Sequence, residues 1–266
     1  MRRTGLRLAV LLLAASMLGA PAPAAERLVE RDGVWAQTYS DVKADANVRF
    51  GHMKNGMRYA VMHNETPKNQ VSVRLIVTSG SMVETDSQLG LAHFLEHMAF
   101  KGSTKVPANE TIKILQRLGL SFGGDTNAST NMESTDYRYD LPRADAESID
   151  TVLMLTRETV SELTLDQGEM DKERGVVLSE ERARDTPGLR SYIAQLKFLL
   201  PGQRAADRLP IGSTEILKNA PVSEIAAYYR AHYRPERTTL VVVGDVDVDQ
   251  IEGKIKTLFE GWTNPT

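Results

Sequence analysis

The stretch GLAHFLEHMAFKGS, residues 90–103, decides how the rest of this chain is interpreted. It holds two histidines four positions apart, His93 and His97, with Glu96 directly before the second. On a helix, positions four apart lie on one face, so both imidazoles can reach one metal ion with the carboxylate beside them. The order His-x-x-Glu-His is typical of one class of zinc hydrolases.

The helix predicted around this motif, residues 89–101, is apolar on nearly every side. Such a helix is buried, and buried ionisable side chains are costly unless they are paired or bind a metal. Neutral imidazole nitrogens are good zinc ligands, so one zinc ion would account for all three polar residues. The alternative, two ordinary core histidines beside a chance glutamate, explains the full pattern less well.

A third ligand is needed, because a catalytic zinc usually takes three protein ligands. The chain has no cysteine, so this ligand is a histidine or a carboxylate. A long helix predicted over residues 165–185 offers Glu173 and Glu180, which are seven positions apart and share one face. The apolar residues on that same face are Met170, Val176 and Val177, so periodicity predicts that this face packs in the core. The pattern does not choose between the two glutamates.

The order of elements favours an α+β fold, because strands and helices mix without a regular βαβ alternation. Period-two alternation and turn signals predict strands at 57–63, 71–79, 135–141 and 239–243. The further helices predicted from their apolar spacing lie at 109–118, 144–163, 189–199, 223–232 and 248–259.

The composition limits the number of domains and the kinds of binding partner that can be expected. With 266 residues, of which 41% are hydrophobic and 25% charged, the chain is long enough for one large domain or two small ones. A net charge of −3 gives no reason to expect a nucleic-acid surface. Without cysteine there is no disulfide and no thiol nucleophile.

The first 25 residues are typical of a secretory signal peptide. Arginines stand at positions 2, 3 and 7, residues 8–18 are apolar, and small residues at 22–24 suit cleavage. The apolar run is too short to span a bilayer comfortably, so we expect no stable membrane span; an uncleaved anchor is the alternative. The expected location is the bacterial periplasm or the exterior, after cleavage.

Four segments resemble the pitrilysin/insulinase metallopeptidases, the inverzincins, in that family's order. They are residues 90–103, DTNAST at 125–130, ERGVVLSEE at 173–181 and YYRAHYRPERTTLVVVGDV at 228–246. The resemblance implies an N-terminal zinc metallopeptidase domain at 47–262, preceded by a linker or arm at 26–46. It also implies the fold of one half of a mitochondrial-processing-peptidase-like enzyme, a mixed, largely antiparallel sheet with helices packed on it.

The resemblance assigns roles to the residues of the motif. His93 and His97 match the family's zinc ligands, and Glu180 matches its third ligand. Glu173 matches a carboxylate that supports the site from behind the ligands, and Glu96 matches the catalytic base.

Asn127 and Ala128 match an edge segment that pairs with the backbone of the substrate. Backbone pairing holds an extended peptide without selecting its side chains. The resemblance therefore implies a peptide or an unfolded protein as substrate.

Members of this family work as two homologous halves, joined in one chain or contributed by two subunits. Residues 263–266 resemble the start of a linker between the halves, and the second half is absent from this sequence. We expect the homologous half in the same longer chain or in a partner subunit. One Zn²⁺ per catalytic half is implied, with weak peptide cleavage by this half alone.

The sequence therefore predicts a zinc-dependent endopeptidase in which Glu96 activates the attacking water. One alternative is a non-catalytic binding or assembly subunit of the same fold, which the complete motif disfavours. The other is a zinc hydrolase of a small metabolite, which the peptide-pairing segment around Asn127 disfavours. Zinc rather than manganese or cobalt is expected from the type of ligands.

Overall fold

The computed structural model describes residues 34–263. The predicted signal peptide, the first part of the predicted arm and residues 264–266 therefore lie outside the described residues. The strands are β1 (Val48–His52), β2 (Arg58–His63), β3 (Val71–Val77), β4 (Thr126–Thr130), β5 (Thr135–Leu141) and β6 (Thr238–Gly244). The α-helices are α1 (Leu91–Met98), α2 (Thr111–Arg117), α3 (Ala146–Ser161), α4 (Gln167–Arg184), α5 (Pro187–Leu199), α6 (Thr214–Asn219), α7 (Val222–His232) and α8 (Val248–Phe259). Short 3₁₀ turns are η1 (Ala36–Thr38), η2 (Ser81–Val83), η3 (Asp86–Gln88), η4 (Arg204–Asp207) and η5 (Pro235–Arg237).

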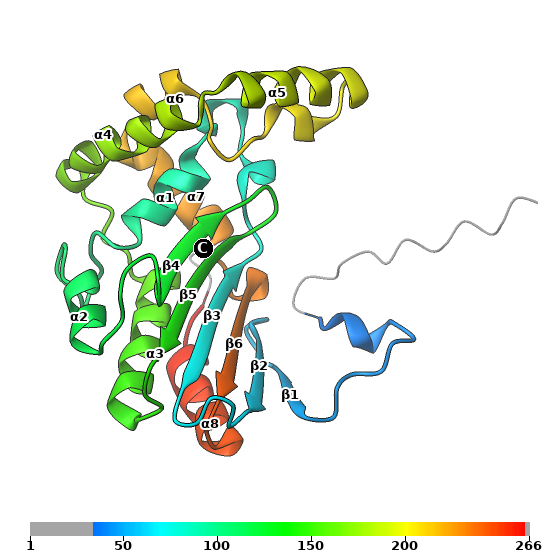
Figure 1. Ribbon diagram of the computed structural model, residues 1–266, viewed down its shortest axis with the longest axis vertical. Helices are drawn as coiled ribbons and strands as arrows, with labels where there is room; N and C mark the ends of the chain where they lie inside the picture. Colours follow the sequence, from blue (N-terminus) through cyan, green and yellow to red (C-terminus); the bar gives the residue numbers. More distant parts are fainter. Residues whose placement is uncertain (1–33, 264–266) are drawn as a thin grey trace, which may run out of the picture.

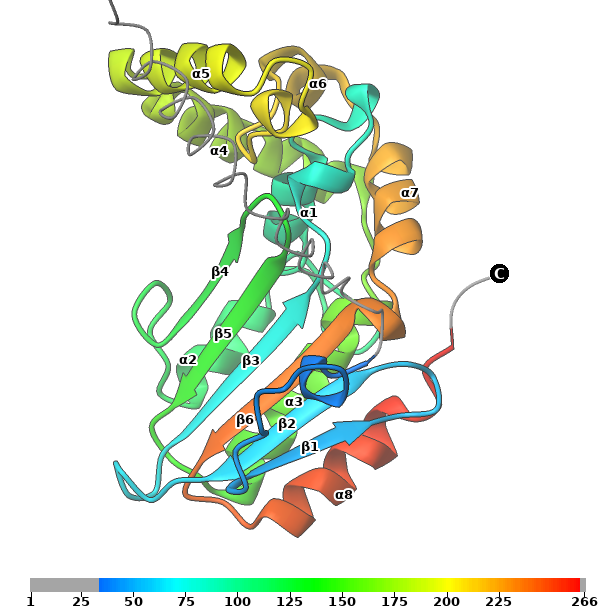
Figure 2. The ribbon, with the colours of Figure 1, turned by 90° about the vertical axis from the view of Figure 1, so that its right-hand side faces the viewer.

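The strands form one six-stranded sheet in the order β1-β2-β6-β3-β5-β4 (Figure 2). Only β2 and β6 run parallel, and every other pair in the sheet is antiparallel. The predicted α+β class with a mixed, largely antiparallel sheet is confirmed. The last described strand in sequence, β6, lies in the middle of the sheet. The sheet is therefore continuous only when residues 238–244 pair with both β2 and β3.

One face of the sheet carries the core. In β3 and β5, buried and half-buried residues alternate along the whole strand, as period-two pleating requires. Helices α3 and α8 cover this face, and they lie behind the sheet in Figure 2. The buried side chains on it include Val73, Leu75, Tyr137, Tyr139, Leu240 and Val242.

Helix α1 lies beyond one end of the sheet, below α4 and beside α7 (Figure 1). It contacts α4, α7 and the edge strand β4. The motif helix is therefore enclosed by two other helices and the end of a strand, which explains why its sequence is apolar all round.

Strand β1 and helix α6 were not predicted from the sequence, and β4 was expected only as the edge segment around Asn127 and Ala128 that the resemblance implies. Strand β1 contains Gly51 and shows no regular burial alternation, β4 follows a glycine-rich turn, and α6 has only six residues. Each is too short or too irregular to carry a clear period. The described part of the predicted arm contains only η1, and Trp35 ties it to the sheet by donating from Nε1 to the Gly51 carbonyl, 2.8 Å away.

Within residues 34–263, the helices are all too short or too polar to cross a bilayer.

Candidate metal centre

Helix α1 presents the motif. It starts after Gly90, whose φ of 97° lies in the left-handed region that glycine tolerates. Every residue of α1 except His97 is classed as buried. His93 is 5% exposed and Glu96 is 8% exposed, so the predicted burial of the ionisable groups on this short helix is confirmed for these two, and His97 is half-buried.

Helix α4 brings the two candidate carboxylates. Asp166 caps its start by accepting a hydrogen bond from the Glu169 amide, 2.9 Å away. Glu173 is buried at 8% exposure, and Glu180 lies about two helical turns further along the same face.

The apolar residues of that face divide in two. Met170 and Val177 anchor it in the core, but Val176 is 46% exposed and lines the pocket instead. The expectation that Val176 packs in the core was wrong, because the helix faces an open pocket there.

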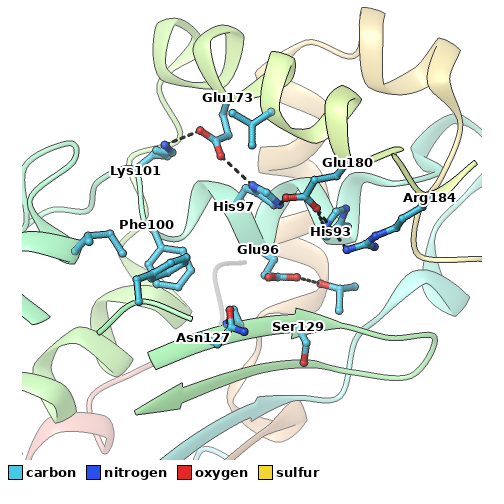
Figure 3. A pocket seen from close by; sticks show the side chains of 15 residues that line it. His93, Glu96, His97, Phe100, Lys101, Asn127, Ser129, Glu173, Glu180 and Arg184 are labelled. Carbon is cyan, nitrogen blue, oxygen red and sulfur yellow. Dashed lines mark hydrogen bonds and ion pairs between the residues drawn. The ribbon is translucent and has the colours of Figure 1, made fainter. Parts of the chain in front are cut away.

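His93, His97 and Glu180 converge (Figure 3). One ligand atom from each lies within 4.8 Å of the others, and this trio is the one such group among residues 34–263. Nε2 of His93 is 3.5 Å from Glu180 Oε2, and Nε2 of His97 is 3.7 Å from Glu180 Oε1. Ligands held tetrahedrally at ~2.0–2.1 Å from zinc lie roughly 3.4 Å apart. The three side chains therefore fit a zinc ion with only small adjustments.

Glu173 approaches the same site from behind. Its Oε1 is 2.9 Å from Nδ1 of His97, and its Oε2 is 2.5 Å from Nζ of Lys101. A carboxylate at Nδ1 fixes the ring so that Nε2 faces the centre, which is the usual support for a metal-binding histidine. Glu173 does not join the trio, so the geometry separates the two glutamates that periodicity left equivalent.

The electrostatics of the two histidines differ. Burial lowers the pKa of His93 to about 4, with smaller effects from His97 and Arg184. This keeps His93 neutral, as a metal ligand must be. For His97, burial also lowers the pKa, but the hydrogen bond to Glu173 and the nearby carboxylates outweigh it and raise the pKa above its usual value. A cation at the centre would shift His97 back toward its neutral form.

Glu96 points into the pocket beside the trio (Figure 3). One of its oxygens, Oε2, accepts a hydrogen bond from Thr130 Oγ1 at 2.7 Å. Burial raises the pKa of Glu96, while the Thr130 hydrogen bond opposes that change. A carboxylate held by one oxygen and made more basic by burial is suited to accept and return a proton.

Strand β4 forms the other wall. It is an edge strand, paired only with β5 in the sheet. Asn127 and Ala128 both line the pocket with Glu96 and the trio. The Ala128 amide donates to Asn127 Oδ1 at 3.0 Å, not to β5, so it faces the free edge. This edge can accept an extended peptide backbone once the Asn127 side chain moves aside.

The pocket encloses about 540 Å³ and is lined by apolar side chains as well as by these polar groups. The apolar lining residues include Phe100, Ile112, Phe122 and Val176.

The polar lining residues that were missed from the sequence include Lys101, Arg184 and Thr130. Lys101 stands four positions after His97 and Arg184 four after Glu180, so helical spacing could have found both. Thr130 gave no signal.

The remaining histidines do not enter this pocket. His63 Nδ1 lies 3.0 Å from the Val246 carbonyl, and His232 Nδ1 lies 3.2 Å from Arg237 Nη1. These two contacts indicate structural roles for His63 and His232, and His52 is not among the lining residues.

A chain with this fold and this arrangement of two histidines and three glutamates has the features of a zinc metallopeptidase. The insulinase family, peptidase family M16, matches residues 59–189, and the description "Peptidase M16 inactive domain" matches residues 220–266. The chain belongs to the insulinase, or M16, family of peptidases.

Individual relatives agree. The "Probable zinc protease PqqL" of Haemophilus influenzae is 37% identical over 212 residues, which are 80% of this chain and 23% of that protein. The crystal structure of the first half of the periplasmic protease PqqL from Escherichia coli has a TM-score of 0.80 and 33% identity, covering 85% of this chain and 48% of that one.

A third relative has been solved with a protein bound. The ferredoxin protease FusC, as a mutant in complex with Arabidopsis ferredoxin, gives a TM-score of 0.78 at 29% identity, covering 82% of this chain and 24% of that one. The chain thus spans about a quarter of the length of such relatives.

Proposed function

We propose that residues 47–262 form the zinc-binding domain of a peptide-cleaving enzyme, an endopeptidase. The observation that carries the proposal is the convergence of His93, His97 and Glu180, with Glu96 beside them, in a pocket bounded by an edge strand. A small-metabolite hydrolase would have no use for a free strand edge in its site.

In this proposal, Nε2 of His93, Nε2 of His97 and a Glu180 oxygen hold the ion, and Glu173 orients the His97 ring. A bound zinc would act as a Lewis acid: it would lower the pKa of a bound water to about 7 and polarise the scissile carbonyl. Thr130 holds Glu96 Oε2, which leaves the other carboxylate oxygen free to take a proton from the attacking water. Glu96 then returns that proton to the leaving amine.

The substrate peptide would extend β4 at its free edge. The Ala128 amide would donate to a substrate carbonyl in place of Asn127 Oδ1. A peptide or unfolded segment suits this arrangement, because backbone pairing needs an extended chain. The FusC complex with ferredoxin supports a protein substrate by analogy.

The expected location is the periplasm or the exterior, and the expected partner is a homologous second half. The periplasmic relative from Escherichia coli and the lengths of the relatives support both. Residues 263–266 would then begin the connection between the halves.

The test replaces Glu96 by glutamine. The full chain and Glu96→Gln are assayed for zinc content and for cleavage of a quenched peptide, with and without chelator. We expect Glu96→Gln to keep zinc and to lose roughly 10²–10⁴-fold in turnover, because proton transfer at the carboxylate is removed. Chelator should abolish cleavage by the unsubstituted chain.

The matched control is Glu133→Gln, since Glu133 is an exposed glutamate in the turn between β4 and β5. Its turnover should be unchanged. Full activity of Glu96→Gln, or chelator-resistant cleavage, would contradict the proposed mechanism.

A further inference from the structure

A fully buried glutamate sits at the start of the motif helix. Glu84 has 0% exposure, and its carboxylate accepts hydrogen bonds from two backbone amides there. The Gly90 amide lies 3.1 Å from each carboxylate oxygen, and the Ala92 amide lies 2.8 Å from Oε1. No part of the proposed mechanism uses this residue.

These bonds replace an ordinary helix cap. The first amides of a helix have no partner within it, and the N-cap residue of α1 is a glycine, which has no side chain to supply one. Glu84 supplies the acceptor from six residues earlier, and in its ionised form the carboxylate suits the positive end of the helix.

The segment that carries Glu84 is held in place by its own surroundings. The Glu84 carbonyl accepts hydrogen bonds from Arg208 Nε, at 3.1 Å, and from Arg204. Ser81 Oγ donates to the Arg208 carbonyl at 2.5 Å. Burial raises the pKa of Glu84 to about 7, against the opposing effect of the helix amides and Arg208. A group this costly to bury needs its bonds to α1 kept intact.

Backbone contacts with residues 212 and 213 also hold the residues directly before α1 in place. The Ser213 amide donates to the Leu89 carbonyl at 3.2 Å. A Cβ added to Gly212 would lie 2.3 Å from the Gly90 Cα, so the two backbones touch. Because α1 has only about two turns, it cannot define its own position, and these anchors set it.

We infer that Glu84 is a positioning residue of the metal centre, which sets the placement of α1 and hence of both histidines against Glu180. The inference rests on the proposed function, since it concerns zinc binding at that site. Ligand groups must be held within about 0.5 Å, and His93 lies one position after the capped Ala92 amide. Loss of the cap therefore moves a ligand directly.

The experiment measures zinc affinity by chelator competition for the full chain, Glu84→Gln and Glu84→Asp. Glutamine keeps the shape but turns an amide group toward the helix amides, and aspartate keeps the charge but is too short. Both should bind zinc roughly 10–100-fold more weakly, the usual effect of residues that support metal ligands. The visible spectrum of the Co²⁺-loaded protein should change as well, because it reports ligand geometry.

The control is Glu158→Gln. Glu158 is 2% exposed and accepts the Lys105 amide at 2.8 Å, so its loss destabilises the fold without touching the start of α1. It should lower unfolding stability and leave zinc affinity unchanged. Zinc affinity within about twofold of the unsubstituted chain in a folded Glu84 variant would overturn the inference, since the expected loss is larger. Absence of zinc binding by the unsubstituted chain would overturn the proposed function, and the inference with it.

Discussion

At the scale of single residues, the site pairs a carboxylate, that of Glu173, with two basic groups. Lys101 and His97 share the two oxygens of Glu173. Burial raises the pKa of Glu173, but its hydrogen bonds to His97 and Lys101 outweigh this and lower the pKa below its usual value. Glu173 therefore stays ionised and can support the His97 ring, and each of its oxygens already has a partner.

The two glutamates of α4 should respond differently to the same substitution. Glu180→Gln removes the charge of the proposed third ligand and should abolish tight zinc binding. Glu173→Gln keeps all three proposed ligands and should weaken binding roughly 10–100-fold. Isothermal titration of zinc into each variant measures the difference, and the opposite order would exchange the two roles.

At the scale of elements, the site depends on how α1, α4 and the edge strand β4 pack against one another. Helix α1 supplies both histidines, α4 crosses it with the carboxylates, and β4 ends the sheet beside them (Figure 1). The edge position of β4 matters most for substrate, because only an edge strand has unpaired backbone groups.

Ala128→Pro tests the strand edge. Proline removes the amide that faces the free edge and leaves the ladder to β5 in place, a position where proline is tolerated. We expect KM for a peptide to rise about tenfold, the value of one lost hydrogen bond, with zinc affinity unchanged. Ala128→Val, which keeps the amide, is the control. An unaltered KM in the proline variant would argue against strand pairing.

At the scale of the whole molecule, we expect this chain to form one wall of a larger site. The matched region of 212 residues is 23% of the length of the Haemophilus influenzae relative, so that protein is about four times as long as the matched region. Zinc binding needs only the residues present, whereas holding a peptide during reaction needs surfaces on both sides of it.

The isolated chain is therefore expected to bind zinc at one equivalent and to cleave peptides slowly. A longer version that includes a homologous second half should cleave the same peptide at least about tenfold faster, with the same zinc affinity, because the peptide is then oriented from both sides. Steady-state rates for the two proteins at matched zinc loading measure this. Equal rates from a monomeric isolated chain would refute the need for a second half.

The sequence by itself determined the motif, its burial and the class of fold. His93, Glu96 and His97 are local in sequence, so helical spacing alone places them together. The period of β3 and β5 is likewise local and predicted their strands. The structure then confirmed an α+β fold, in which helices pack on one face of a mixed sheet.

Periodicity left Glu180 and Glu173 equivalent, and their roles followed only from the family resemblance. The tertiary structure places Glu180 with the two histidines and Glu173 behind His97, and it alone brings Glu84 to the start of α1. These contacts connect segments whose mutual distance depends on how α1, α4 and the loop before α1 pack. Periodicity reports which face a residue occupies but not what that face meets. That is why Val176, predicted in the core, faces the pocket, and why the contact of Glu84 with the start of α1 was not predicted from the sequence.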